Sequence, residues 1–386
     1  MSKLALLGGK PEVDGPIARF NTIGERELQN VLECMSGGAL SGFLAGKEFG
    51  GYWVRKLEDE LAQAINVKHA IASNSATSSL LAAAFAIDLN PECKFLCPAL
   101  TMSATCAAPM FTGATPVFCD VDEDTFNMNA SEVIGNNTSL PPVDAVFLTH
   151  LFGLSCGETW WTGWAHDHRI KIVVDAAQAP FAMCGNAYAG TEADIGILSW
   201  NVHKPLESGE GGMCLTNNDE LAHRIRMFVN HGECSGERRI GLNLRMCEVT
   251  AAIAQAQLER ADEIIEGRIA LADALSSAVD NLPGLRAPYV PPQCRHVYYC
   301  WPLKVSGDRD WFVRAMNAEG VPLQTGYRDP LYRLPAFQQF SRPCPVAERL
   351  HDKELALFEI CAWDPSREQI FQITNAFHKV SNHANR

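Results

Sequence analysis

The sequence has no long hydrophobic run and no excess of positive charge. No apolar stretch approaches the roughly 20 residues needed to cross a bilayer, so no membrane-spanning segment is predicted. The 32 lysines and arginines are outnumbered by 45 aspartates and glutamates, which gives a formal net charge of -13. Nucleic acids and anionic membranes both require a basic face, so neither is expected as a partner.

Paired CxxC spacing is also absent, although the chain has 14 cysteines. Several of them, including Cys97, Cys119 and Cys214, lie in apolar runs typical of buried strands. We therefore expect reduced, buried thiols instead of a disulfide scaffold. The first ten residues, MSKLALLGGK, are too short and too lightly charged for a signal peptide, so a cytoplasmic location is expected.

Two common nucleotide-binding signatures are missing as well. The chain has neither a GxGxxG motif nor the lysine-bearing P-loop, and no metal site is predicted from its motifs. A phosphorylated ligand would therefore have to be held by other local features.

The chain contains four apolar, strand-like segments at intervals that leave room for helices. They are KFLCPALT, TPVFCDVD, DAVFLTH and KIVVDAAQ. This alternation predicts an α/β fold with a mainly parallel sheet and helices on both faces. A long helical pattern that starts near residue 248 marks a junction, so we predict a large domain over 1–255 and a smaller α/β domain over 256–386.

The segment Ile195 to Gly212 contains a single lysine, Lys204, on a predicted loop after a buried strand. Pro205 disfavours a helix at Lys204, and the glycines near residue 210 predict a tight turn. Ligands bind at the carboxyl ends of strands in such sheets, where a partly desolvated lysine can act as a nucleophile. A solvated surface lysine is the ordinary alternative.

Asp175 falls at the end of the strand that begins at Lys171, and Gln178 follows it. An aspartate here and Lys204 together would suit pyridoxal phosphate, because the lysine can form a Schiff base while the acid keeps the ring nitrogen protonated. Gln178 could then bond to the phenolic oxygen. Taken alone, Asp175 is more readily interpreted as a helix N-cap, since two alanines follow it.

The stretch SNSATSSLLAAAFAI runs from small hydroxyl residues straight into a helical pattern. Free amides and a positive dipole at the helix start, with the Ser75 and Thr77 hydroxyls, outline a phosphate cradle. A cap without a ligand is the alternative. His150 ends its strand at the same edge of the sheet, as a catalytic or a structural histidine, and Phe49 lies in a glycine-rich aromatic loop that is either substrate-facing or a connector.

Seven segments together resemble the DegT/StrS family of sugar aminotransferases, over nearly the whole chain. They are NSATSSL, PALTMSAT, GATPVFCDVDEDTFN, DAAQA, SWNVHK with SGEGG, GLNLRMCEVTAAIAQAQLER and GYRDPLYRLPAF. The resemblance implies a pyridoxal-phosphate enzyme with the aspartate-aminotransferase fold, which is fold type I, with a seven-stranded sheet between helices.

By this resemblance Lys204 is the Schiff-base lysine, Asp175 contacts the pyridine nitrogen and Gln178 lies near the phenolic oxygen. The phosphate would contact residues at the helix start and the end of the lysine strand, namely Ser75, Ala76, Thr77 and Ser199. Asn243 would reach that phosphate from the other subunit of a homodimer. Met102 stands where the family usually has an aromatic residue over the cofactor ring, and Ala76 stands where it usually has glycine.

The expected reaction moves an amino group from glutamate or glutamine to a keto-sugar that is linked to a nucleotide. The expected substrate contacts are His150, Phe49, Tyr327, Arg328 and Tyr332. A keto-cyclitol is the alternative acceptor. A sugar dehydratase and a non-enzymatic regulator would also fit this fold, although dehydratases of the fold carry histidine in place of the lysine.

Overall fold

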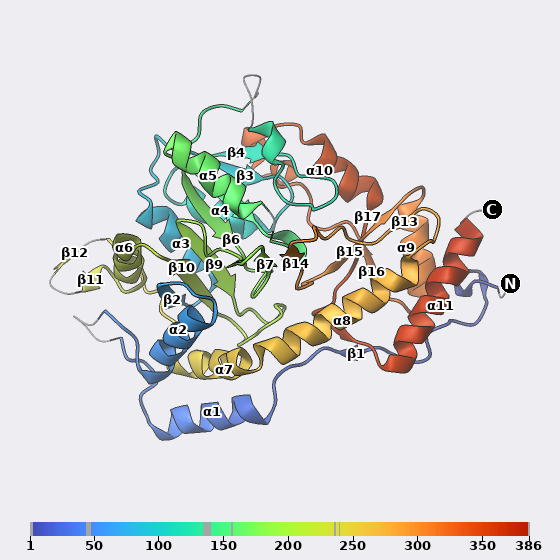
Figure 1. The fold of residues 1–386 in the computed structure, drawn as a ribbon, viewed down its shortest axis with the longest axis horizontal. Helices are drawn as coiled ribbons and strands as arrows, with labels where there is room; N and C mark the ends of the chain where they lie inside the picture. Colours follow the sequence, from blue (N-terminus) through green and yellow to red (C-terminus); the bar gives the residue numbers. More distant parts are fainter. Residues whose placement is uncertain are drawn as a thin grey trace.

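A computed structural model describes residues 3–43, 48–133, 140–155, 157–234, 237–238 and 240–384. The described chain forms a large seven-stranded sheet with its helices and a smaller four-stranded sheet beside it (Figure 1). The two chain ends lie near each other at the side of the smaller sheet (Figure 1). The sequence prediction of an α/β fold with a mainly parallel seven-stranded sheet is confirmed.

The large sheet has the strand order β2-β10-β9-β6-β5-β3-β4. Only β10 runs antiparallel to its neighbours, and the other adjacent pairs are parallel. The carboxyl ends of β9, β6 and β5 therefore meet at one edge. The strands are β2 (His69–Ser73), β3 (Lys94–Pro98), β4 (Thr115–Cys119), β5 (Ala145–Thr149), β6 (Lys171–Asp175), β9 (Ile195–Ser199) and β10 (Gly212–Thr216).

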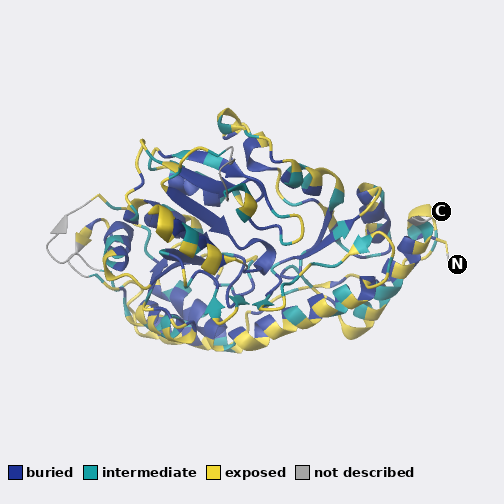
Figure 2. Cartoon of the chain, turned by 45° about the horizontal axis from the view of Figure 1, so that its top comes forward, coloured by how far each residue is buried: buried dark blue, intermediate teal, exposed yellow. Residues whose placement is uncertain are grey.

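Alternate residues of these strands enter two different hydrophobic clusters, because successive side chains of a strand point to opposite faces. Val173 belongs to the cluster covered by α3, α4 and α6, whereas Ile172 and Val174 belong to the cluster covered by α2, α5 and α7. The strands are accordingly buried almost throughout (Figure 2). These helices are α2 (Tyr52–Ala64), α3 (Ala76–Ala86), α4 (Ser103–Met110), α5 (Glu158–His168), α6 (Asp219–Val229) and α7 (Glu248–Glu259).

The smaller sheet has the order β13-β15-β17-β16 and packs against α8, α9 and α11. Its elements are α8 (Ala261–Val279), β13 (Leu285–Arg286), β15 (Trp301–Val305), α9 (Arg309–Ala318), β16 (Leu323–Thr325), α10 (Pro345–Arg349), β17 (Leu355–Phe358) and α11 (Arg367–Ala384). The other elements are α1 (Glu25–Ser36), β1 (Ala18–Arg19), β7 (Met183–Cys184), β8 (Ala187–Tyr188), β11 (Glu233–Cys234), β12 (Glu237–Arg238), β14 (Cys294–Arg295), β18 (Trp363–Asp364), and the short turns η1 (Ala5–Leu7), η2 (Ala130–Glu132), η3 (Leu151–Gly153), η4 (Leu331–Arg333), η5 (Gln338–Phe340) and η6 (Leu350–Glu354).

The start of the chain packs with the C-terminal unit and not with the large sheet. Leu4, Val13 and Ile17 lie in the same cluster as α8, α9 and α11, and β1 pairs with β18. The helical pattern at the junction is interrupted at Arg260, between α7 and α8. We propose that the two domains divide close to this break, a few residues after the predicted boundary, and that the first 20 residues complete the smaller domain.

The stretch after β10 begins as α6, which Asn218 caps by accepting from the Glu220 and Leu221 amides. One local expectation from the sequence is wrong. No helix follows Asp175, where the chain makes turns instead. Within the part of the chain that the structure describes, none of the helices combines the length and the apolar character that crossing a membrane requires.

Candidate active site

Lys204 lies on a compact loop between β9 and β10. The loop is closed by backbone bonds: the Lys204 amide donates to the Asn201 carbonyl at 2.8 Å, and the Ser208 amide donates to the Trp200 carbonyl at 2.8 Å. Gly209 has a φ of +83°, a left-handed conformation that glycine adopts without steric cost. These bonds hold Lys204 just beyond the carboxyl end of β9, as predicted from the sequence.

The Lys204 ammonium lies in a low-polarity environment. Its Nζ is 4.5 Å from the ring centroid of Tyr299. Burial lowers the pKa of Lys204 below its ordinary value, the negative charge of Asp175 opposes that change, and the positive charge of Arg328 adds to it. A fraction of Lys204 is therefore unprotonated at lower pH than for a solvated lysine, and an unprotonated amine is the nucleophilic form.

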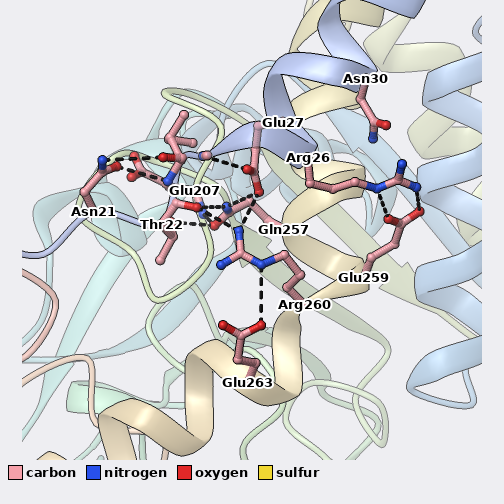
Figure 3. Close-up of polar contacts among 12 residues, drawn as sticks. Asn21, Thr22, Arg26, Glu27, Asn30, Glu207, Gln257, Glu259, Arg260 and Glu263 are labelled. Carbon is pink, nitrogen blue, oxygen red and sulfur yellow. Dashed lines mark hydrogen bonds and ion pairs between the residues drawn. The ribbon is translucent and has the colours of Figure 1, made fainter.

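A polar network anchors the far side of this loop to the first and seventh helices (Figure 3). The buried Gln257 accepts from the Glu207 amide at 3.3 Å and from the Thr22 hydroxyl at 2.7 Å. Its amide nitrogen donates to Glu27 at 2.8 Å, and Glu27 also accepts from Arg260 at 3.2 Å. Glu207 is three residues after Lys204, so this network fixes the path of the chain that leaves the lysine.

Asp175 ends β6 with its carboxylate buried. One oxygen accepts from the Thr105 hydroxyl at 2.6 Å and the other from the Ala177 amide at 3.1 Å. Burial raises the pKa of Asp175, while these two donors and the charge of Lys204 act in the opposite direction. The Ala177 bond forms a turn in which an aspartate bonds two residues onward, so the N-cap interpretation of Asp175 is wrong.

Gln178 is held in one orientation by two neighbours. Its side-chain oxygen accepts from the Phe152 amide at 2.8 Å, and its nitrogen donates to the Tyr327 hydroxyl at 2.9 Å. Burial raises the pKa of Tyr327, so this phenol is neutral. Arg328 is exposed next to it and acts electrostatically on both Tyr327 and Lys204. The structure therefore joins Gln178 to Tyr327, and Arg328 is near enough to both Tyr327 and Lys204 to lower their pKa values.

The start of α3 presents two backbone amides without an acceptor. Ser75 caps the helix by accepting from the Ser78 amide at 3.1 Å, whereas the amides of Ala76 and Thr77 have no acceptor among the described residues. Gly212 allows this helix start to approach β10, because a Cβ at that position would lie 2.3 Å from the Ser75 carbonyl. The sequence pattern indicated only a turn at Gly212. Two amides and the helix dipole favour an anion here.

The sequence matches a known family over most of its length. The family described as DegT/DnrJ/EryC1/StrS aminotransferases matches residues 21–375. The chain belongs to this aminotransferase family. Members depend on pyridoxal phosphate, so the protein is a pyridoxal-phosphate-dependent transaminase.

Two relatives and one solved structure illustrate the similarity. The GDP-perosamine synthase of Caulobacter vibrioides is 30% identical, over 81% of this chain and 84% of its own. A UDP-N-acetyl-3-dehydro-α-D-glucosamine 3-aminotransferase of Acidithiobacillus ferrooxidans is 31% identical, over 78% of this chain and 82% of its own. DesI, solved in the presence of its TDP-sugar product, superposes with a TM-score of 0.85 at 26% identity, covering 99% of this chain and 97% of that one.

The residues present fit the cofactor of this aminotransferase family. The hydrogen bonds that the described residues make to the buried Asp175 carboxylate come from neutral donors, so a protonated ring nitrogen would supply the opposite charge. The amides of Ala76 and Thr77 and the Ser199 hydroxyl offer donors for a phosphate. Ser199 is buried at the end of β9, where its oxygen accepts from the Asn201 amide at 3.2 Å.

Three residues that were predicted to contact the substrate have other contacts in the structure. His150 is buried and bonds to the Glu158 carboxylate at 2.9 Å, which favours the structural alternative. The Tyr332 ring is buried, and its hydroxyl bonds to Glu348, which makes it a packing residue of the η4 turn. The described ring contact of Phe49 is with the Arg226 guanidinium, 4.6 Å from the ring centroid, and no described contact joins Phe49 to the lysine loop.

Met102 and Asn243 are exposed in the single chain. Met102 precedes α4 with 40% of its surface accessible, as expected for a side chain that faces a ligand site or a partner. Asn243 forms an isolated antiparallel bridge with Asn230, and the next residue, Leu244, accepts from the Asn74 amide at 2.7 Å. This segment is therefore anchored to its own chain, with the Asn243 side chain exposed.

Two residues of the site were not predicted from the sequence. Thr105 donates to Asp175 from α4, and Tyr299 lies against Lys204 from the segment before β15. Thr105 is one of two hydroxyl residues in α4, SATCAAPM, and it is the one inside the helix, so its polarity among small apolar residues was an available signal. Tyr299 lies in the apolar run HVYYCW, which gives no comparable signal.

Proposed function

We propose that this aminotransferase moves an amino group from glutamate or glutamine to the keto group of a nucleotide-linked sugar. The observation that carries the proposal is the meeting of Lys204, Asp175 and Gln178 at one sheet edge, beside the two open amides at the start of α3. Pyridoxal phosphate, when bound, would accept the electron pair of the carbon that loses a proton.

Each of these residues has one task in the proposed reaction. Lys204 would hold the cofactor through its side-chain amine and, when that amine is free, would carry the proton that leaves the donor's α-carbon. Asp175 would keep the ring nitrogen protonated, and Gln178 would bond to the phenolic oxygen. Ala76, Thr77 and Ser199 would hold the phosphate, and the polarizable thioether of Met102 would pack against the ring.

Arg328 and Tyr327 are the substrate contacts that the geometry favours. Arg328 is exposed beside Lys204, and a guanidinium binds a carboxylate or phosphate in a bidentate manner. This cation is useful in a protein with a net charge of -13, because both the donor and a nucleotide sugar are anionic. The relatives carry GDP, UDP and TDP in their names, so they support a nucleotide sugar without selecting the base.

The test is a coupled product analysis with nitrogen-15-labelled glutamate or glutamine. The cofactor-loaded protein is incubated with a panel of 3-keto and 4-keto sugars on UDP, GDP and TDP, and products are identified by mass and NMR. We expect the label on one sugar carbon together with the donor's 2-oxo acid, and no product with Lys204→Ala. A label found only on a keto-cyclitol, or a dehydrated sugar without label, would replace the proposed acceptor or reaction.

We also propose that two copies share their active sites, with Asn243 of each copy reaching the phosphate in the other. One chain offers two amides and a hydroxyl at that position, and no contact among the described residues brings a lysine or arginine to them. The outer face of α1 supports a contact between copies, because Leu28, Leu32 and Met35 lie at helical spacing and are 60%, 58% and 55% exposed.

Mixed dimers test this arrangement. Chains with Lys204→Ala and chains with Asn243→Ala are each weak alone, and mixing places both lesions in one site and neither in the other. Activity should recover toward the value for one intact site per dimer. Absence of recovery, with mass spectrometry showing that the chains had exchanged, would place Asn243 in its own site or outside any site.

A further inference from the structure

Two cysteines lie opposite each other where the loop after β6 meets the segment that enters the smaller sheet. Cys184 ends β7, Cys294 begins β14, and the two are direct partners in the antiparallel register. Their sulfur atoms are 2.7 Å apart, and both side chains are half-buried. Cys97, Cys119 and Cys214 are fully buried, as expected from the sequence, whereas Cys184 and Cys294 are free thiols that are only half-buried.

The register of these strands suits a disulfide. The Gly185 amide donates to the Gln293 carbonyl at 2.8 Å, so the adjacent pair is a hydrogen-bonded one. Hydrogen-bonded and non-hydrogen-bonded pairs alternate in an antiparallel ladder, which makes Cys184 and Cys294 a non-hydrogen-bonded pair. Cα atoms in such pairs are about 4.5 Å apart, within the range of about 4.4 to 6.8 Å that a disulfide spans. The bond requires little movement of either strand.

Burial protects five other cysteines from the same reaction. Burial raises the pKa of Cys214, Cys344 and Cys361 to about 12, and it also raises the pKa of Cys97 and Cys119. The thiolate is the reactive form, so these buried groups react slowly. Cys247 is exposed and lies 3.2 Å from the Thr250 hydroxyl, while the neighbouring Cys34 thiol is buried and its pKa is raised, mainly by that burial, so Cys34 is a poor second thiol for a disulfide with Cys247.

We propose that Cys184 and Cys294 form a reversible disulfide when they meet a small-molecule disulfide such as glutathione disulfide. One thiolate attacks a sulfur of the oxidant, forming a mixed disulfide and releasing one glutathione. The second thiolate then attacks the protein sulfur of that mixed disulfide and releases the other glutathione. The two cysteines lose two protons and two electrons in total, and glutathione disulfide is reduced to two thiols.

The bond would fasten together the two segments that flank the active site. β7 follows the turn that contains Asp175 and Gln178, and β14 precedes Tyr299, which lies against Lys204. The two cysteines are 110 residues apart in sequence, and closing so long a loop restricts the unfolded chain strongly. Because the bond forms in the existing register, it stabilises the folded protein and leaves the positions of Asp175 and Lys204 unchanged.

The experiment treats the full-length, cofactor-loaded protein with glutathione disulfide and then blocks the remaining thiols. Trypsin and a glutamate-specific protease are used together, since cleavage after Glu192 separates Cys184 from Cys214. The expected result is one major cross-linked peptide that joins Cys184 to Cys294, with a rise in Tm of several degrees that dithiothreitol reverses. Amino-transfer activity should stay within about twofold of the reduced protein.

Matched variants separate this pair from the other cysteines. Cys184→Ser and Cys294→Ser should each abolish the reversible rise in Tm and leave a glutathione adduct on the remaining cysteine. Cys247→Ser should keep the cross-link and the rise. The proposal is overturned if the major cross-link joins other cysteines, if only unlinked glutathione adducts form in the wild-type protein, or if the linked protein has an unchanged or lower Tm.

Discussion

Two neighbouring strands of the large sheet lead to buried titratable residues at their carboxyl ends. The two residues differ in the partners that their side chains have inside the protein. β5 is followed by His150 and β6 ends in Asp175, and the His150 amide donates to the Asp175 carbonyl at 3.0 Å. The His150 ring bonds to the Glu158 carboxylate, which also accepts from the Gly190 and Glu192 amides. Among the described residues, Asp175 accepts from the Thr105 hydroxyl and the Ala177 amide, and both Lys204 and His150 oppose the rise in its pKa that burial causes.

The difference shows that a position at the carboxyl ends of the strands, where ligands bind, does not by itself make a residue functional. The Nε2 atom of His150 lies 2.9 Å from the Glu158 carboxylate and 3.3 Å from the Ser155 hydroxyl, so the ring is tied to the start of α5 and, through Glu158, to the residues near 190. Within the described part of the chain no cation bonds to the Asp175 carboxylate, so its charge can be matched by a ligand. The following predictions test this contrast, from the largest expected effect to the smallest.

The largest effect is expected from Lys204→Ala, which removes the amine that attaches the cofactor. The variant should form no cofactor linkage that borohydride can trap, and its amino-transfer rate should fall by about 10² to 10⁴-fold or more. Peptide mapping after reduction gives the measurement. Cofactor recovered mainly on another lysine of the wild-type protein would show that the assignment of Lys204 is wrong.

His150→Gln should reduce stability and leave the chemistry largely intact. The substitution disturbs the contact with the buried Glu158, and we expect a loss of roughly 1 to 3 kcal/mol in the free energy of unfolding. Denaturant unfolding measures this loss, with His166→Gln as a control because His166 is a strongly exposed residue of α5. An unchanged stability for His150→Gln would argue that its contact with Glu158 is unimportant.

The pH dependence of cofactor attachment should shift in Asp175→Asn. Attachment to the apoprotein requires unprotonated Lys204, so its rate rises with pH through the pKa of that lysine. Asp175 raises this pKa, and its removal should move the midpoint to lower pH, whereas His150→Gln should leave the midpoint in place. Stopped-flow attachment at saturating cofactor gives both midpoints, and a shift to higher pH in Asp175→Asn would contradict the electrostatic account.

The lowered pKa of Lys204 also has a consequence for stability, although a smaller one. Folded Lys204 binds fewer protons than unfolded Lys204 between its lowered pKa and about 10.4, so this group makes the apoprotein more stable as pH rises through that window. Lys204→Met removes the titration and should flatten that part of the profile. Chemical unfolding of both proteins between pH 7 and 10 measures the slope, and identical slopes would mean that the pKa of Lys204 is not lowered.

Much of the sheet and the central pair of residues could be predicted from the sequence. The runs that end at Asp175 and Ser199 are apolar and bounded by turn residues, so the strands and their carboxyl ends follow from local pattern. The helix after Asp175 was predicted wrongly because two alanines favour a helix locally, while the aspartate bonds to the Ala177 amide instead. Local propensity gave the wrong answer where one side-chain bond determined the turn.

Contacts between segments that are distant in the sequence could not be predicted from the sequence. Tyr299 and Tyr327 approach Lys204 and Gln178 from the C-terminal part of the chain, more than 90 residues away in sequence. The packing of residues near Leu4 against the smaller sheet and the pairing of Cys184 with Cys294 are of the same kind. Spacing along the chain does not encode which side chains meet after folding, so these contacts required the three-dimensional structure.

The most direct test of the central contrast is a single-turnover reaction with an amino donor. Wild-type, Asp175→Asn and His150→Gln proteins are loaded with cofactor, mixed with glutamate or glutamine, and followed by the loss of the absorbance of the lysine-bound cofactor. We predict a rate that falls by about 10² to 10⁴-fold in Asp175→Asn and stays within about threefold in His150→Gln, each per folded molecule. A near wild-type rate in Asp175→Asn, or an equal loss in both variants, would contradict the account.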